Sequence, residues 1–152
     1  MKKVLLVSLV LMLALCWATA ALAGSADEAK ALVKQAIAMA KAKGVEATLK
    51  AVGDPKGPFI KGDLYVFAGS ISKVQLVAHP YKPHLVGKDL SGMKDIKGKL
   101  FFIEFCNVAK NGGSGWVDYY WPKPGSKTPV LKSSYIEGVP GGDTYFGCGI
   151  YK

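Results

Sequence analysis

The residues whose types could bind a metal or act as a nucleophile are His79, His84 and Ser114. None of them belongs to a catalytic or metal-binding sequence pattern. The two histidines lie in a proline-rich segment, without the further ligands at helical or strand spacing that a metal site needs. Ser114 follows two glycines but lacks the last glycine of a nucleophile elbow, which favours a glycine-rich turn. The sequence also holds no dinucleotide-binding fingerprint and no lysine-bearing phosphate loop. We therefore predict no enzyme, no metal site and no cofactor.

The tyrosines and tryptophans carry more information. Tyr65 and Phe67 share one face of an expected strand, and Trp116 and Tyr120 share one face of another. Most such rings fill a core, yet buried Tyr and Trp need hydrogen-bond partners, and these residue types also line small-ligand pockets. Lys132 belongs to a strand beside this set. It is either a cation for a ligand carboxylate or an exposed strand lysine.

Cys106 and Cys148 are the cysteines that follow the N-terminal segment. An even pair in an exported protein suggests a disulfide, because that compartment is oxidising. Free cysteines, however, bury readily as small hydrophobic residues. Neither cysteine lies on an obvious loop, so a disulfide and two free thiols both stay open.

Residues 1–23 have the three parts of a cleavable signal peptide. Two lysines precede an apolar run over 4–15, and Ala21-Leu22-Ala23 supplies a cleavage site before Gly24. The competing interpretation is a retained membrane anchor, since the apolar segment is about long enough to span a bilayer. Cleavage is favoured because no basic stop-transfer cluster follows. Lipid modification at Cys16 is rejected because a bulky leucine stands where such processing needs a small residue. We predict a periplasmic protein with no membrane span after cleavage.

The charge pattern argues against a nucleic-acid partner. The formal net charge is +9, but all 20 basic residues are lysine. Forked contacts from arginine are the commonest device for reading phosphates and guanines, and export argues against nucleic acid independently. We favour a solvated surface with some attraction for anions. Residues 24–152 suffice for one domain with one core.

A capping box predicts the first helix. Ser25 is the expected N-cap with Glu28 three residues later, and apolar residues follow at helical spacing to about Lys43. A second short helix is expected over 45–52. Residues 100–110 look like a strand by propensity, but their apolar positions fall at i, i+4 and i+7. We therefore predict a buried amphipathic helix there, ended by an Asn-Gly-Gly sequence.

The remaining apolar runs read as strands. Residues 64–68 and 74–78 are expected to form a hairpin across Gly69-Ser70, followed by an irregular segment to Gly98. Turn signals then separate three further strands, over 115–121, 130–137 and 145–151. Runs of antiparallel strands with segregated helices indicate the α+β class.

Seven short stretches between Phe59 and Tyr151 carry a resemblance to a known family. They are DLYVF (63–67), AHP (78–80), LVGKDL (85–90), GWVDY (115–119), WPKP (121–124), KSSY (132–135) and GCGIY (147–151). In this order and spacing they resemble the single Cache domain, type 2, a PAS-like extracellular sensor module. The long N-terminal helix also fits, because this family packs such a helix along its sheet. The expected organisation is a signal peptide over 1–23 and one Cache domain over 24–152.

The resemblance implies a five-stranded antiparallel sheet, with a ligand held between the sheet and the crossover from His79 to Gly113. It implies a sensor that binds a small organic molecule, often a carboxylate. The chain shows no second transmembrane helix and no signalling domain, so we expect signal transduction or chemotaxis in trans, through a membrane receptor, kinase or transporter. The alternative is an exported interaction or scaffold protein of the same fold, with a filled core and no ligand.

The resemblance also implies which residues surround the ligand. We place there Tyr65, Phe67, His79, Phe101, Phe105, Trp116, Tyr120, Lys132 and Tyr135. Alternation does not tell which strand face looks inward, so Asp118 and Tyr119 stay substitutes for their neighbours. Because the chain has no arginine, Lys132 is the first choice for a ligand carboxylate.

Overall fold

In the computed structural model, which describes residues 24–152, helix α1 (Ala26–Lys43) begins at the predicted capping box. The Ser25 hydroxyl accepts the backbone N–H of Glu28, and the Glu28 carboxylate accepts the backbone N–H of Ser25. A second helix, α2 (Val45–Gly53), follows Gly44, whose φ of 89° turns the chain without a Cβ clash. Both predicted N-terminal helices are confirmed.

The described residues contain six strands, which form one antiparallel sheet. The strands are β1 (Ile60–Lys61), β2 (Leu64–Ser70), β3 (Gln75–Ala78), β4 (Ser114–Pro122), β5 (Pro129–Gly138) and β6 (Thr144–Tyr151). Their order is β1-β2-β6-β5-β4, and β3 pairs with the end of β2 that β1 leaves free. The last three strands occur where the sequence predicts them. The two-residue β1 is an addition to the expected five-stranded sheet.

The turn between β2 and β3 lies later in the chain than predicted. Gly69 and Ser70 do not form the turn but belong to β2, where Gly69 pairs with Tyr145. The turn follows at residues 71–74, and the Asp143 carboxylate holds it by accepting the hydroxyls of Ser70 and Ser72 and the Ser72 N–H. A glycine stands at 69 for packing, because the Tyr145 ring occupies the space that a Cβ would take.

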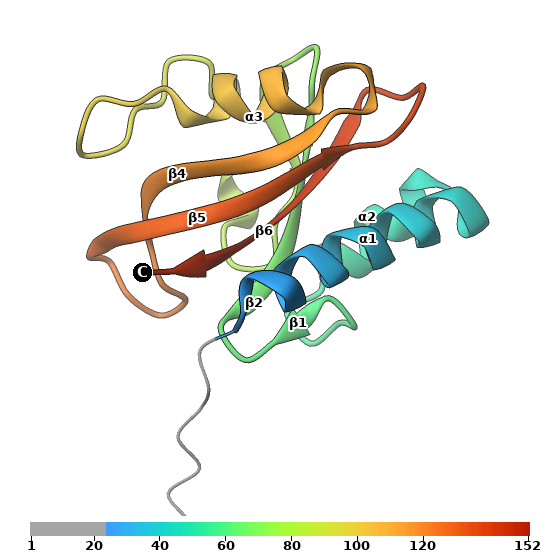
Figure 1. The fold of residues 1–152 in the computed structure, drawn as a ribbon, viewed down its shortest axis with the longest axis horizontal. Helices are drawn as coiled ribbons and strands as arrows, with labels where there is room; N and C mark the ends of the chain where they lie inside the picture. Colours follow the sequence, from blue (N-terminus) through green and yellow to red (C-terminus); the bar gives the residue numbers. More distant parts are fainter. Residues whose placement is uncertain (1–23) are drawn as a thin grey trace, which may run out of the picture.

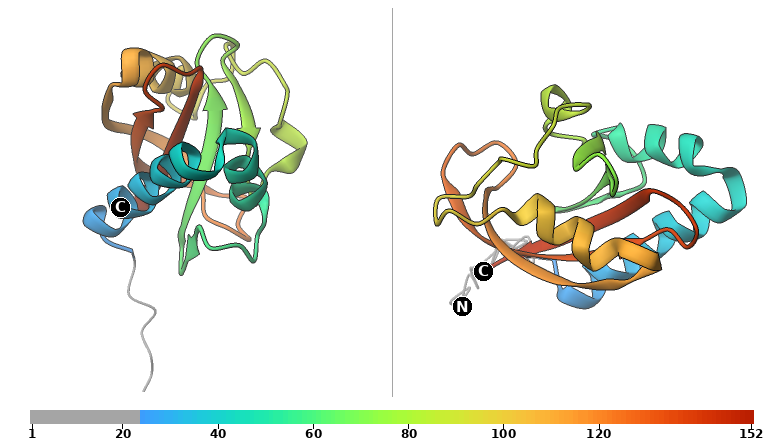
Figure 2. Two further views of the ribbon diagram at one scale, coloured as in Figure 1. Left: turned by 90° about the vertical axis from the view of Figure 1, so that its right-hand side faces the viewer. Right: turned by 90° about the horizontal axis from the view of Figure 1, so that it is seen from above.

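The chain between β3 and β4 crosses one face of the sheet. It carries the short 3-10 turn η1 (Pro83–Leu85), the helix α3 (Phe101–Ala109) and a second 3-10 turn, η2 (Lys110–Gly112). The helix predicted over 100–110 is therefore confirmed. Figures 1 and 2 show α3 on one side of the sheet and α1 with α2 on the other. The result is a three-layer arrangement with the sheet in the middle.

The sheet separates two clusters of buried side chains. The helix-side cluster lies between the sheet and α1 and α2, and is mostly aliphatic. The crossover-side cluster lies beneath the crossover and is rich in aromatic rings, including Tyr65, Phe67, Phe101, Phe102, Phe105, Tyr119 and Tyr145. β2 contributes to both clusters, so each of its residues is buried.

Cys106 and Cys148 do not form a disulfide. Cys106 lies on α3 in the crossover-side cluster, whereas Cys148 lies on β6 in the helix-side cluster. The Cys106 thiol donates instead to the backbone oxygen of Ser70, at 3.7 Å. Burial raises the pKa of the Cys106 thiol to about 11 and that of Cys148 to about 12. Of the two alternatives left open by the sequence, the structure has free thiols.

No helix within residues 24–152 is long and apolar enough to cross a membrane. The predicted signal peptide, residues 1–23, lies outside the described residues.

Candidate functional site

The candidate site is built from alternate positions of the long strands, whose side chains point toward the crossover. Tyr119 on β4 pairs with Lys132 on β5, and Lys132 pairs with Tyr151 on β6. Tyr65 and Phe67 of β2 belong to the same crossover-side surface. One lysine is thereby placed among aromatic rings in the interior.

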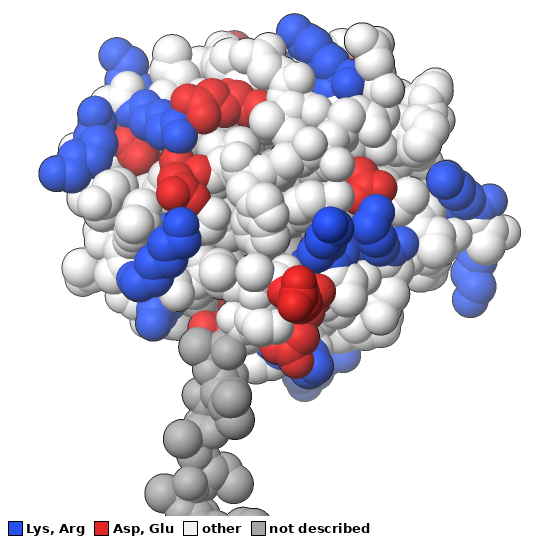
Figure 3. Space-filling view, viewed as in Figure 1, with Lys and Arg blue, Asp and Glu red and all other residues white. Residues whose placement is uncertain are grey.

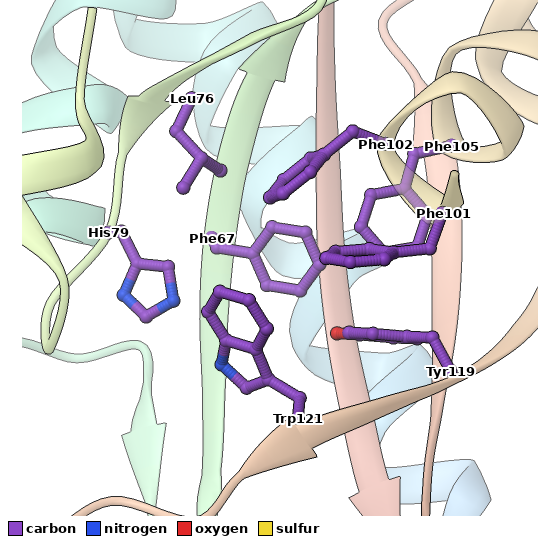
Figure 4. A pocket seen from close by; sticks show the side chains of 8 residues that line it. All are labelled: Phe67, Leu76, His79, Phe101, Phe102, Phe105, Tyr119 and Trp121. Atoms are coloured by element: carbon purple, nitrogen blue, oxygen red, sulfur yellow. The ribbon is translucent and has the colours of Figure 1, made fainter. Parts of the chain in front are cut away.

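An aromatic cavity lies between this surface and α3 (Figure 4). Its volume is about 10 Å³, which is roughly the space that one water molecule needs. Phe101 stacks on Tyr119 with the ring planes 14° apart and the centroids separated by 4.6 Å. The cavity is lined by Phe67, Leu76, His79, Phe101, Phe102, Phe105, Tyr119 and Trp121.

A polar cavity adjoins the aromatic one and shares His79 and Trp121 with it. Its volume is about 40 Å³. It extends to the exposed Lys123 in the connection between β4 and β5. The polar cavity is lined by Tyr65, His79, Tyr81, Lys82, Trp121, Pro122, Lys123, Pro124 and Gly125.

Lys132 is completely buried directly behind the polar cavity. Its Nζ donates to the Tyr65 hydroxyl at 2.8 Å and lies 4.0 Å from the centroid of the Tyr65 ring. The rings of Tyr151 and Phe67 are 4.9 and 5.7 Å from Nζ, within range of cation–π attraction. Among the described residues no carboxylate pairs with this amine, and burial lowers its pKa to about 7.

The space for this lysine comes from Gly149 on β6. A Cβ at this position would lie 2.6 Å from Cε of Lys132 and would overlap the Ser134 hydroxyl. That hydroxyl hydrogen-bonds the Tyr119 hydroxyl at 3.0 Å. A side chain at 149 would therefore disturb the lysine and the tyrosine together.

His79 stands where the two cavities meet. Its side chain is 4% exposed, and its ring lies 5.1 Å from the Tyr65 ring and 6.1 Å from the Phe67 ring, centroid to centroid. Nδ1 accepts the backbone N–H groups of Tyr81 and Lys82, both at 3.1 Å. Burial, with a smaller contribution from the positive charge of Lys132, lowers the pKa of His79 to about 3.

The Tyr65 hydroxyl joins Lys132 to the polar cavity. Its oxygen accepts from Lys132, and its own proton is donated to the Tyr151 hydroxyl over a long 3.4 Å contact, which a ligand oxygen can replace. The Tyr151 hydroxyl, 3.4 Å away, donates to the backbone oxygen of Pro122 at 3.1 Å. Burial raises the pKa of Tyr65 above its usual value, which keeps this phenol a donor.

The structure brings together six of the nine residues that the sequence placed around a ligand. Tyr65, Phe67, His79, Phe101 and Phe105 line the two cavities. Lys132 adjoins them through Tyr65 but lines neither cavity.

The other three, Trp116, Tyr120 and Tyr135, lie away from both cavities. Trp116 is 42% exposed and packs on Tyr135, on the face of the sheet opposite the crossover. Tyr135 belongs to the helix-side cluster, and its hydroxyl donates to Glu137. Alternation along β4 places Tyr120 on the same face as Trp116. The structure therefore does not bring these three residues to either cavity.

Sequence reasoning missed Tyr119 and Trp121 as lining residues, although Tyr119 was kept as a substitute. The opposite face of β4 was considered, but one strand alone does not show which of its faces is inward. Tyr119 pairs with Lys132 on the neighbouring strand. Directly paired residues point to the same face of a sheet, so both side chains point toward the crossover. Tyr81 was missed because it lies in an irregular segment without periodicity.

The charge around the site suits an anion. No aspartate or glutamate is found among the described residues that line the two cavities. On the face of the molecule in Figure 3, lysines are scattered among acidic residues and form no single large patch. Residues 24–152 also contain no cluster of three or more His, Cys, Asp or Glu side chains able to hold a metal ion. The interior donors therefore favour a small ligand that offers oxygen acceptors.

Comparison with protein families gives a match to the family described as Single Cache domain 2, over residues 3–152. Among characterised proteins, the chain is similar to methyl-accepting chemotaxis protein McpP of Pseudomonas putida, with 38% identity over 77 residues. That match covers 51% of this chain and 14% of the relative, so the chain spans only a small part of the length of that receptor.

Three solved structures share the fold. A periplasmic sensor domain of a chemotaxis protein is 35% identical, with a TM-score of 0.66, over 82% of this chain and 88% of that one. A Cache chemosensory domain described for its carboxylic acid recognition is 30% identical, with a TM-score of 0.65, over 82% and 86%. A methyl-accepting chemotaxis protein from Vibrio parahaemolyticus is 26% identical, with a TM-score of 0.69, over 82% and 86%.

Proposed function

Because the chain belongs to the Single Cache domain 2 family, whose chemoreceptor members are ligand-binding sensor domains, we propose that it binds a small carboxylate. It does so outside the cytoplasm, in the periplasm, after removal of residues 1–23. The bound state then supports signal transduction or chemotaxis through a separate membrane receptor, kinase or transporter.

The observation that carries the proposal is a buried set of hydrogen-bond donors with no acid among the cavity-lining residues. The Tyr65 hydroxyl borders the polar cavity and is backed by the ammonium group of Lys132 at 2.8 Å. His79, whose ring lies 5.1 Å from that of Tyr65, contributes a ring nitrogen to the same cavity. Donors in a water-poor interior stabilise an anion strongly, because charge-assisted hydrogen bonds are about twice as strong as neutral ones.

The roles of Lys132 and Tyr65 differ. Tyr65 contacts the ligand oxygen, whereas Lys132 polarises the Tyr65 hydroxyl from behind it. The pKa of Lys132 is about 7 in the empty site, and the negative charge of a bound carboxylate raises this pKa, so that the amine is protonated in the complex. The aromatic cavity receives the apolar part of the ligand, since aromatic side chains dominate its lining.

The comparisons support this choice of ligand class. One structural neighbour is described for its carboxylic acid recognition, and the chemotaxis protein from Pseudomonas putida supports the connection to chemotaxis.

A thermal-shift and calorimetry series tests the proposal, with propionate and alanine as a matched pair of probes. We expect propionate to raise the melting temperature of the protein, because a ligand that binds only the folded state must stabilise it. Alanine adds an ammonium group for which the cavities offer no acid, so we expect little or no shift.

Substitutions at Lys132 and Tyr65 test whether these two residues form the binding site. Lys132→Met and Tyr65→Phe should each weaken propionate binding by about 1.5–3 kcal/mol, the range for a hydrogen bond to a charged group. Trp116→Phe is the control and should bind propionate as the unaltered protein does, because Trp116 lies on the opposite face. Equal affinity in all three variants would remove Lys132 and Tyr65 from the site.

The small size of the aromatic cavity, about 10 Å³, favours a second candidate, an interaction or scaffold protein with a filled core. Under that alternative no carboxylate shifts the melting temperature, and mass spectrometry of the protein purified under native conditions finds no retained small molecule. A shift with propionate that Lys132→Met abolishes would exclude it.

A further inference from the structure

The two ring nitrogens of His79 have different surroundings. Nδ1 accepts two backbone N–H groups, those of Tyr81 and Lys82. A neutral imidazole carries one proton, and a nitrogen that accepts hydrogen bonds does not hold it. The backbone after β3 thereby selects the tautomer in which the proton of His79 is on Nε2.

The other side of the ring faces the site. Figure 4 shows one nitrogen of His79 turned toward Trp121 and Phe67, and the other turned away from the cavity. Nε2 has no hydrogen-bond partner among residues 24–152, and since no side-chain nitrogen or oxygen there is both buried and unpartnered, this atom is reachable from the cavities that His79 lines. A donor that opens only into a small, mostly aromatic cavity has few partners there, so a ligand oxygen that reaches it gains a hydrogen bond.

We propose that His79 is a ligand donor of fixed tautomer, whose Nε2–H is aimed by the loop backbone and donates to one oxygen of the bound carboxylate. Tyr65 donates to the other oxygen, since its ring lies 5.1 Å from that of His79 on the same cavity. This inference rests on the proposed function and adds the residue that orients the anion in it.

The burial of His79 preserves this role over a wide pH range. Its pKa of about 3 keeps the ring neutral, so it donates from Nε2 and still accepts at Nδ1. The charged groups that act on the ring are Lys132 from the sheet and Lys82 and His84 from the crossover, and all oppose its protonation. A protonated ring would have to give up the two backbone bonds at Nδ1.

Two substitutions separate the two nitrogens. His79→Asn places an amide oxygen near the position of Nδ1, where asparagine accepts a backbone N–H two residues on, but it provides no donor at the position of Nε2. His79→Gln places an amide N–H₂ near the position of Nε2 and removes the acceptor for the loop. We expect His79→Asn to melt close to the unaltered protein yet bind propionate about tenfold or more weakly. His79→Gln should show the reverse, a lower melting temperature with propionate affinity within a few-fold.

Calorimetry with propionate and thermal unfolding are measured on the unaltered protein and on both His79 variants. Unchanged propionate affinity in His79→Asn would overturn the proposal. So would a parallel loss of affinity and stability in both variants, which indicates a role in folding alone. If the unaltered protein binds neither propionate nor acetate, the proposed function fails rather than the assignment of His79.

Nitrogen NMR of the histidines tests the tautomer with no ligand present. We expect the His79 ring to show the Nε2–H form, without titration between pH 5 and 8. The resonances are assigned with a His84→Gln variant. The Nδ1–H tautomer, or a ring that titrates within this range, would overturn the proposal independently of any carboxylate.

Discussion

Lys132 is a buried amine whose partners are a hydroxyl and three aromatic rings, and this environment determines how the protein responds to pH. In the folded protein its pKa is about 7, whereas an unfolded lysine keeps a value near 10.5. Between these two values the unfolded state binds more protons than the folded state. The free energy of unfolding contributed by this residue therefore rises as pH increases from about 7.

We predict that stability rises with pH in the unaltered protein relative to Lys132→Met. The difference should grow by up to about 1.4 kcal/mol per pH unit between pH 7 and 9, one proton per molecule. Urea unfolding of both proteins at pH 6, 7, 8 and 9 measures it. Tyr65, Tyr151 and Cys148 titrate in both proteins, so their contributions largely cancel. A difference that is independent of pH would show that Lys132 is charged in the folded state throughout this range.

The sequence alone predicted the identity of this lysine but not its position. Lys132 is the candidate because no arginine competes for a carboxylate, and because it belongs to a strand beside the aromatic residues. Its complete burial depends on Gly149, which lies on another strand and makes the space for Cε. A cross-strand requirement of this kind leaves no local signal, so an exposed lysine was an equal alternative.

At the scale of the strand, the absence of a side chain at Gly149 on β6 leaves the space that the Lys132 side chain fills. Gly149→Ala should lower the free energy of unfolding by about 1–3 kcal/mol, the cost of overpacking a filled interior. Gly53→Ala, at the end of α2, is the matched control, because its Cβ would meet no atom within 4 Å. Chemical unfolding of both variants measures the effect. Equal stability of the two proteins would mean that the sheet shifts to accept the methyl group.

The sheet separates the side chains of the two cysteines, because Cys106 lies on α3 at one face and Cys148 on β6 points to the other face. Cys106 and Cys148 belong to opposite clusters, so a disulfide would need the sheet to open. We predict that a reductant leaves the melting temperature unchanged, and that both thiols react with a thiol reagent only after denaturation. Cys106→Ala with Cys148→Ala is the control that removes this reactivity. A clear loss of melting temperature on reduction would contradict the structure.

The helices and late strands could be predicted because their signals are local. The capping box at Ser25 and Glu28 depends on residues three apart, and the helix over 101–109 shows its own periodicity. The turn after β2 could not, because the Asp143 carboxylate that holds it comes from a segment about seventy residues later. Likewise, Trp116 and Tyr119 are equivalent by strand propensity and differ only in which layer covers each face.

At the scale of the whole molecule, the two faces of the sheet carry different clusters of buried side chains. The helix-side cluster is mostly aliphatic and packs α1 and α2 against the strands. The crossover-side cluster holds both cavities and the buried amine. Six of the nine residues expected around a ligand lie in this layer, so the sequence indicated the layer that holds the candidate site. The sequence did not show which face of β4 points toward the crossover.

A hydrogen bond at Gly24 provides a test of the predicted cleavage before this residue. The nitrogen of Gly24 lies 3.0 Å from Oδ1 of Asp63, in the loop before β2. Cleavage before Gly24 would turn this amide nitrogen into an ammonium group, and the hydrogen bond would become a charge-assisted ion pair. We predict that the protein recovered from the periplasm of a secreting cell begins at Gly24, as measured by intact mass.

Substitution of Asp63 provides a second test of cleavage before Gly24. Asp63→Asn should lower the free energy of unfolding of the processed protein by up to about 1 kcal/mol, as for a partly exposed ion pair. In a form that carries extra residues before Gly24, the nitrogen is an uncharged amide, so the same substitution should cost less. Equal costs in both forms, or recovery of the protein with Met1 retained in the membrane fraction, would contradict cleavage at this site.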